Sequence, residues 1–191
     1  MPRFKTLHQR IGENATVRVL SSTYDMLDRL NEADADIVLS YGAKDTTGDR
    51  TVVFRDEVTA VCSPDFAATH AGVLRRPIAR WGSLPFLEMV GPTKEWTTWG
   101  DWFEAVGRPD IPPRFVNYHD YIYLIDAAAS GRGLALGWRN FLDRFFDLGS
   151  LVPVFDGYVK FDHAHYARLT ERGRRHPLAR RCLDVLGSLA N

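Results

Sequence analysis

The stretch AAASGRGLALGW, residues 127–138, joins an apolar helical segment to an apolar strand through Gly131-Arg132-Gly133. Glycines at this spacing either cradle a phosphate or end a helix. In dinucleotide-binding folds the order along the chain is strand, glycine turn, helix, so that the helix amides face the pyrophosphate. Here the order is helix, turn, strand, the next glycine is Gly137, and the chain contains no Gly-Lys-Ser or Gly-Lys-Thr. We therefore predict that the loop is structural and binds no nucleotide.

Segments with helical and strand patterning alternate on both sides of this loop. The helical segments are residues 2–10, 26–30, 98–106, 119–130, 141–146 and 177–190, and one more helix starts at Ser63-Pro64. The strand segments are residues 16–20, 35–39, 57–62, 84–90, 114–116, 134–136, 151–154 and 166–169. The order helix, strand, helix, strand at the start of the chain implies parallel pairing with helices on the sheet faces. The sequence therefore predicts an α/β fold.

Composition narrows the class of protein. The 191 residues include 24 Lys plus Arg and 24 Asp plus Glu, which gives a formal net charge of zero. Nucleic-acid-binding modules are usually basic, so this balance argues against one. No apolar run reaches the length of a membrane span, and the N-terminus has no signal-peptide pattern, so we expect a cytoplasmic protein. Cys62 and Cys182 lie far apart in apolar runs and are expected to be buried free thiols.

Residues that could carry catalysis or bind a metal are few. His163 and His165 would point to one face of a strand, but a zinc site needs a third and a fourth ligand, and no cluster of Cys or Asp follows. No Gly-x-Ser-x-Gly motif or comparable nucleophile signature is present. We therefore expect no catalytic residue, no metal, no cofactor and no enzymatic activity.

Aromatic residues crowd the central part of the chain. Trp99 and Trp102 have helical spacing and are expected in the core. Trp96, Tyr118 and Trp138 each lie at or just past the end of an expected strand, where open α/β sheets bind their ligands. These three rings either line a pocket or pack in a core. If they form a box, cation–π attraction makes a quaternary ammonium a natural guest.

Four segments, taken together, carry a family resemblance. They are ADADIVLSYG at 33–42, EVTAVCSPDFAATH at 57–70, FVNYHDYIYLIDAAASGRGLALGW at 115–138 and LGSLVPVF at 148–155. In this order and spacing the chain resembles the effector-binding (regulatory) domain of LysR-type transcriptional regulators over nearly its whole length. Asn117-Tyr118 with Gly137-Trp138-Arg139 is similar to the glycine-cleavage-activator branch and, within it, to regulators of choline sulfate use.

The resemblance implies a two-lobed fold of the periplasmic-binding-protein type 2, each lobe a mostly parallel sheet flanked by helices. Lobe one would comprise residues 1–62 and 161–191, and lobe two residues 63–160. The implied function is to sense a small-molecule effector held in the cleft between the lobes. The implied effector-binding residues are Ser22, Thr23 and Tyr41 from lobe one, and Trp96, Asn117, Tyr118, His119 and Trp138 from lobe two.

The type of effector is constrained only loosely. Asn117 is also placed to cap the helix that begins near His119, and the N-terminus of that helix would favour an anionic group. We therefore expect either an anionic or a quaternary-ammonium metabolite. Two other classes of protein stay open as alternatives, a solute-binding protein and a two-lobed α/β enzyme.

The chain departs from the family pattern at its start. It contains no winged helix-turn-helix and no linker helix, so DNA would be contacted only through a helix-turn-helix absent from this chain. The first strand and most of the first helix of lobe one are also missing, which indicates a fragment or a truncated gene. Members of the family pair through regulatory domains, so we expect a homodimer or a higher oligomer, with weaker pairing than in a complete regulator.

Overall fold

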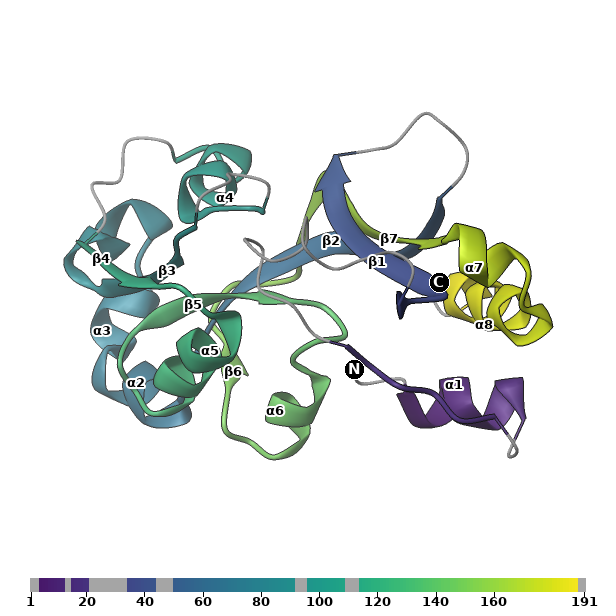
Figure 1. Ribbon diagram of the computed structural model, residues 1–191. Helices are drawn as coiled ribbons and strands as arrows, with labels where there is room; N and C mark the ends of the chain where they lie inside the picture. The colour runs from purple at the N-terminus through teal and green to yellow at the C-terminus, as the bar shows by residue number, and fades with distance from the viewer. Residues whose placement is uncertain are drawn as a thin grey trace. The chain divides into compact units, whose positions relative to one another are not determined.

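The computed structural model describes residues 4–12, 15–20, 34–43, 50–91, 96–108 and 114–188. The chain divides into two compact units. The first unit is Met1–Arg55 with Asp162–Asn191, and the second unit is Asp56–Phe161. Two long strands, β2 (Thr51–Cys62) and β7 (Val159–Leu169), contribute residues to both units (Figure 1).

The second unit is a sheet in the order β2-β5-β3-β4, with β6 paired to β2. Its further strands are β3 (Pro85–Met89), β4 (Arg114–Tyr118), β5 (Leu134–Trp138) and β6 (Val152–Pro153). Its helices are α2 (Pro64–Thr69), α3 (Ala71–Leu74), the 3-10 helix η3 (Ile78–Ser83), α4 (Trp99–Ala105), α5 (Tyr121–Ala129) and α6 (Asp143–Asp147). Strand β3 is parallel to both β4 and β5, whereas β2 is antiparallel to β5 and β6. The carboxyl ends of β3, β4 and β5 therefore point the same way.

Two apolar clusters fill the second unit. Strand β3 alternates between them, because Phe86 belongs to the first cluster and Leu87 to the second. The first cluster contains six buried aromatic side chains, Phe66, Trp81, Phe86, Trp99, Trp102 and Phe103, and the last three come from α4. Helix α5 supplies the second cluster and lies along β3 and β5 (Figure 1). The predicted core positions of Trp99 and Trp102 are confirmed, since both are fully buried.

The two ends of helix α4 are determined by residues next to it in the sequence. Thr98 accepts from the amide of Asp101, and the carboxylate of Asp101 accepts from the amide of Thr98 at 2.7 Å, which makes a capping box at the start of the predicted helix. The helix is followed by Gly107 with φ of 71°, a left-handed conformation that favours glycine.

Both glycines of the loop between α5 and β5 occupy positions where the backbone favours or requires glycine. Gly131 has φ of 78° and follows Ser130, the C-cap of α5, as expected for a residue that ends a helix. A Cβ on Gly133 would lie 2.6 Å from the carbonyl oxygen of Pro85, so only glycine lets this segment approach β3.

The first unit contains α1 (Phe4–Ile11), β1 (Ile37–Ala43), α7 (Glu171–Arg174), α8 (Pro177–Ser188) and the first-unit parts of β2 and β7. Strand β7 lies between β1 and β2, and β1 pairs with it in antiparallel orientation. The core gathers residues from α1, α8 and the strands: Leu7, Ile11, Val53, Ala167, Leu169, Ala179, Leu183 and Leu186.

Two strand predictions need correction. Residues 16–20 form no strand, and Val19 and Leu20 are exposed, so the expected parallel pairing of this segment is wrong. Alternation makes a strand only where a partner supplies hydrogen bonds, and β1 takes β7 as its partner instead. Strand β7 begins at Val159 rather than at residue 166. The helix expected over residues 26–30 lies outside the described residues. No described helix has the length and apolarity needed to cross a membrane.

Candidate effector pocket

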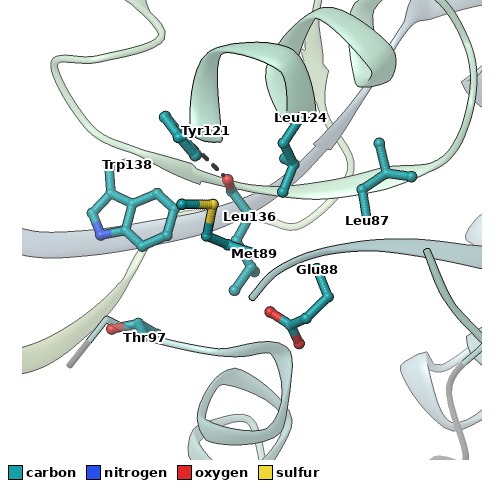
Figure 2. Close-up of a pocket in the computed structure, with 8 residues that line it drawn as sticks. All are labelled: Leu87, Glu88, Met89, Thr97, Tyr121, Leu124, Leu136 and Trp138. Atoms are coloured by element: carbon teal, nitrogen blue, oxygen red, sulfur yellow. Dashed lines mark hydrogen bonds between the residues drawn. The ribbon is translucent and has the colours of Figure 1, made fainter. Parts of the chain in front are cut away.

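A small pocket lies at the carboxyl ends of β3 and β5 in the second unit. It holds about 10 Å³, which is on the order of the space that one water molecule needs. Figure 2 shows the side chains that line it, which come from β3, α5, β5 and the residues just before α4. They are Leu87, Glu88, Met89, Thr97, Tyr121, Leu124, Leu136 and Trp138.

The two hydroxyl groups of the pocket already donate their protons. Thr97 Oγ1 donates to the carboxylate of Asp56 at 3.0 Å, and Asp56 is 1% exposed. Tyr121 Oη donates to the carbonyl oxygen of Leu136 at 3.3 Å (Figure 2). The oxygen of Tyr121 also has the backbone amide of Trp138 as a hydrogen-bond partner, and Thr97 Oγ1 keeps lone pairs that can accept a hydrogen bond.

Glu88 is the carboxyl group of the pocket. Its side chain accepts from the backbone amide of Trp99 at 3.3 Å, at the first turn of α4. Burial raises the pKa of Glu88 from 4.5 to about 7, a shift that the amides of Trp99 and Met89 oppose and that nearby Asp101 reinforces. The charge of this carboxyl group therefore responds to small changes of environment near neutral pH.

Aromatic rings form one side of the pocket. Tyr121 meets Trp138 edge to face, with ring centroids 5.1 Å apart. Next to them, Trp96 donates its indole N–H to the carbonyl oxygen of Met89 at 3.2 Å. The same ring covers Gly91, where a Cβ would lie 2.4 Å from the indole carbon Cη2. The pocket therefore lies between the aromatic rings of Tyr121 and Trp138 and the half-buried carboxyl group of Glu88.

Of the residues expected to bind the effector, Trp138 lines this pocket. Asn117 and Tyr118 stand opposite Glu88 and Met89 in the parallel register of β3 and β4, and His119 is exposed directly after β4. Tyr41 belongs to the first unit, where its ring stacks on His163 with centroids 5.8 Å apart. Ser22 and Thr23 lie outside the described residues.

One expectation about the effector loses its structural basis, and another stays a prediction. Tyr118 packs against the second cluster and Trp138 against the first, and a cage of Trp96, Tyr118 and Trp138 for a quaternary ammonium stays a prediction. Asp120, not Asn117, caps α5, because its carboxylate accepts from the amide of Ile122 at 2.7 Å. With an acidic cap already bound to its first turn, this helix end is not the anion site that was expected.

His163 and His165 lie on one face of β7, as the alternation predicted. Their rings contact Tyr41, and the ring of His165 also meets Phe54 at 5.6 Å. Across the described residues, no group of three or more His, Cys, Asp or Glu side chains is placed to hold a metal ion.

Sequence reasoning missed Glu88, Thr97, Tyr121 and Asp56. One signal was available for Glu88, which is the only charged residue in the apolar strand segment LPFLEMV at 84–90. The side chains of this strand alternate between two apolar cores, and a carboxyl group is costly to bury inside either core. We therefore expect such a carboxyl group at the edge of a core. The other three come together only through the fold.

A family model, LysR substrate binding domain, matches residues 1–190. The chain belongs to the LysR substrate-binding domain family. Its fold is similar to the effector domain of the transcriptional regulator AmpR of Pseudomonas aeruginosa, with a TM-score of 0.72, 21% identity, and coverage of 98% of this chain and 87% of that one. It is also similar to the regulatory domain of CrgA, a LysR-type regulator from Neisseria meningitidis, with a TM-score of 0.72, 20% identity and coverage of 100% and 91%.

The chain is also similar to part of a longer protein of known structure. The full-length virulence activator AphB of Vibrio cholerae matches with a TM-score of 0.61 and 16% identity over 97% of this chain and 62% of AphB. No curated protein sequence matches the chain. The predicted family and two-lobed α/β fold are confirmed, and the chain is an effector-sensing regulatory domain of the LysR type.

Proposed function

We propose that this LysR-type domain binds its effector at the strand-end pocket of the second unit. The observation that carries the proposal is the convergence, at the carboxyl ends of parallel strands β3 and β5, of Glu88, Thr97, Tyr121 and Trp138 around one cavity. Open α/β sheets bind ligands at the carboxyl ends of their strands, and binding sites combine apolar walls with a few polar groups.

Flanking residues would extend the site beyond the cavity. Trp96 is hydrogen-bonded to Met89, and Asn117 and Tyr118 lie on the neighbouring strand, so these side chains can contact a ligand larger than the cavity. His119 follows them on the exposed side. Ser22, Thr23 and Tyr41 stay candidates for additional contacts.

We propose further that the domain acts within a homodimer or higher oligomer and reaches DNA only through a helix-turn-helix outside these 191 residues. The exposed apolar residues Phe115, Val116, Ile122 and Tyr123 lie on β4 and α5, and β4 ends the strand order of the second unit. A large exposed apolar surface at a sheet edge is typical of a protein interface. Membership in the glycine-cleavage-activator branch likewise stays a proposal, supported by Asn117-Tyr118 and Gly137-Trp138-Arg139.

A screen of metabolites by thermal shift, with each incubation also checked for product by mass spectrometry, tests the function. A sensor domain gains melting temperature with its effector and returns that effector unchanged, because only the folded state binds it. Conversion of a stabilising compound would favour the two-lobed enzyme instead. The variant Trp138→Ala should abolish the shift, whereas Tyr158→Ala, which removes a ring of the same unit outside the pocket, should leave it in place.

A further inference from the structure

The first unit carries a dense group of arginines on its two C-terminal helices and at the end of α1. Residues 171–184 contain five arginines and two acidic residues, whereas the chain as a whole has no net charge. This segment therefore has a formal charge of +3, and the other residues together have a formal charge of −3. The exposed arginines of α1, α7, α8 and the turn between α7 and α8 are called the arginine surface below: Arg10, Arg172, Arg174, Arg175, Arg180 and Arg181.

The fold gathers these arginines from α1, α7 and α8. Arg181 Nη2 donates to the carbonyl oxygen of Arg10 at 3.0 Å, and Arg10 Nη1 donates to Ser188 Oγ at 3.0 Å, so α1 and α8 are tied together. Helix α7 contacts α8, which follows it along the chain (Figure 1). Gly173 of α7 has no room for a side chain, because the carbonyl oxygen of Asp36 lies against it. The arginines therefore stand on one packed group of helices within the first unit.

Ion pairs with the described residues neutralise only part of this surface. Arg172 pairs with the carboxylate of Asp36 at 3.0 Å. Four other arginines of the surface form no ion pair with any residue that the structure describes: Arg10, Arg175, Arg180 and Arg181. Guanidinium groups held near one another repel, and each presents N–H donors in a fixed planar fork. An anionic partner would remove this repulsion and accept several charge-assisted hydrogen bonds at once.

The charge distribution of the chain favours a short anionic partner over a long one. Helix α8 has 12 residues, which gives the arginine surface a length of about 18 Å along this helix. Duplex DNA carries one charge per about 1.7 Å of its axis and would extend well past this surface. Beyond the surface, the net negative charge of the remaining residues would repel it. A short acidic segment of a protein meets the arginines alone, and its carboxylates match the planar forks of guanidinium groups.

We propose that the arginine surface of the first unit binds an acidic segment of another protein, in which several Asp or Glu side chains lie close together. The partner is held by charge-assisted hydrogen bonds from exposed guanidinium groups, so its affinity falls as the salt concentration rises. The surface belongs to the first unit, whereas the strand-end pocket belongs to the second unit. The proposal therefore goes beyond the proposed function and does not depend on it.

The test titrates the 191-residue chain into three fluorescent probes, a decaglutamate peptide, a decaglutamine peptide and a DNA duplex, and measures anisotropy at near-physiological salt. Decaglutamate should bind saturably, with a dissociation constant at least about tenfold lower than that of either other probe. The double variant Arg175→Glu with Arg180→Glu should raise this constant at least about tenfold. The control is Arg75→Glu with Arg76→Glu, which reverses two exposed arginines after α3 in the second unit and changes the net charge equally. It should change the constant less than about threefold.

The proposal is overturned if decaglutamate does not bind saturably, or if both double variants weaken its binding equally, because the peptide then responds only to net charge. Tighter binding of the duplex than of decaglutamate, lost only in the variant of Arg175 and Arg180, would assign the surface to nucleic acid and also overturn the proposal. Thermal melts show whether each variant still unfolds cooperatively. The milder pair Arg175→Gln with Arg180→Gln should weaken decaglutamate binding in the same direction if charge reversal prevents folding.

Discussion

Gly133 lies where the loop after α5 passes the backbone of β3, and a side chain there would meet the carbonyl oxygen of Pro85 at 2.6 Å. Backbone atoms of a central strand cannot move aside cheaply, so Gly133→Ala should lower the free energy of unfolding by about 1 to 3 kcal/mol. Gly72 offers a matched control, since its added Cβ would meet nothing within 4 Å. Gly72→Ala should be neutral or stabilising by up to about 1 kcal/mol. Urea denaturation of both variants measures the difference, and equal behaviour would contradict the close approach.

The free energy of unfolding should depend on pH through the carboxyl group of Glu88. Its folded-state pKa, about 7, lies above the ordinary value of 4.5, so between these values the folded state holds a proton that the unfolded state has lost. The contribution of Glu88 to stability therefore falls as pH rises from 4.5 to 7, and the charged form is disfavoured in the fold above pH 7.

Glu88→Gln removes this charge and should be more stable than the parent chain at pH 8, by on the order of 2 kcal/mol. The advantage should be largely lost at pH 4.5, where this side chain is protonated in the folded state and about half protonated in the unfolded state. Melting temperatures at the two pH values measure it, with Glu104→Gln as the charge-matched control. An unchanged difference between pH 4.5 and pH 8 would mean that Glu88 is not buried in solution.

At the scale of the element, the cap of α5 gives the sharpest contrast. Asp120 binds the amide of Ile122 at 2.7 Å, whereas Asn117 lies exposed on β4 three residues earlier. Asp120→Ala should cost about 1 kcal/mol of stability, as the loss of a helix cap usually does. Asn117→Ala should stay within about 0.5 kcal/mol of the parent chain. Chemical denaturation measures the loss of stability in each variant. A larger loss in Asn117→Ala than in Asp120→Ala would indicate that Asn117 is the cap.

Elements with a local signal were predictable. The helical pattern of residues 98–106 predicted α4, which begins after the cap Thr98, and Ser63-Pro64 predicted the start of α2, where Ser63 accepts from the amide of Phe66 at 3.1 Å. Residues 16–20 alternate as well as many strands do, yet they form none, because pairing depends on a partner that is distant in sequence. The early part of β7 escaped prediction for the converse reason, since β1 pairs with it from Ala43 and His163 onward.

The candidate site was predictable only where a strand end marked it. Trp138 is the last residue of β5 and was expected in a binding site, and it lines the pocket. Glu88 and Tyr121 are 33 positions apart in sequence and meet only because β3, α5 and β5 are packed together in one unit. Thr97 joins them through its hydrogen bond to Asp56, 41 positions away. No local pattern encodes such distances, so the polar half of the pocket required the structure.

At the scale of the whole molecule, the apolar surface of α5 and β4 predicts self-association. Ile122 is 76% exposed and Tyr123 is 70% exposed, and both lie in the first turn of α5. Ile122→Lys places a charge in the proposed interface and should shift the chain toward monomer in sedimentation velocity. Leu148→Lys is the control, because Leu148 is 68% exposed at the end of α6. Equal sedimentation of both variants with the parent chain would exclude this surface from the assembly.

The central claim is that the strand-end pocket of the second unit binds the effector without converting it. Isothermal titration calorimetry of the strongest metabolite from the screen, with the parent chain and with Trp138→Ala, tests it most directly. We expect one site per chain, affinity at least about tenfold weaker in Trp138→Ala, and ligand recovered unchanged after the titration. Full affinity in Trp138→Ala, in a variant that still melts cooperatively, would place the effector elsewhere and contradict the account.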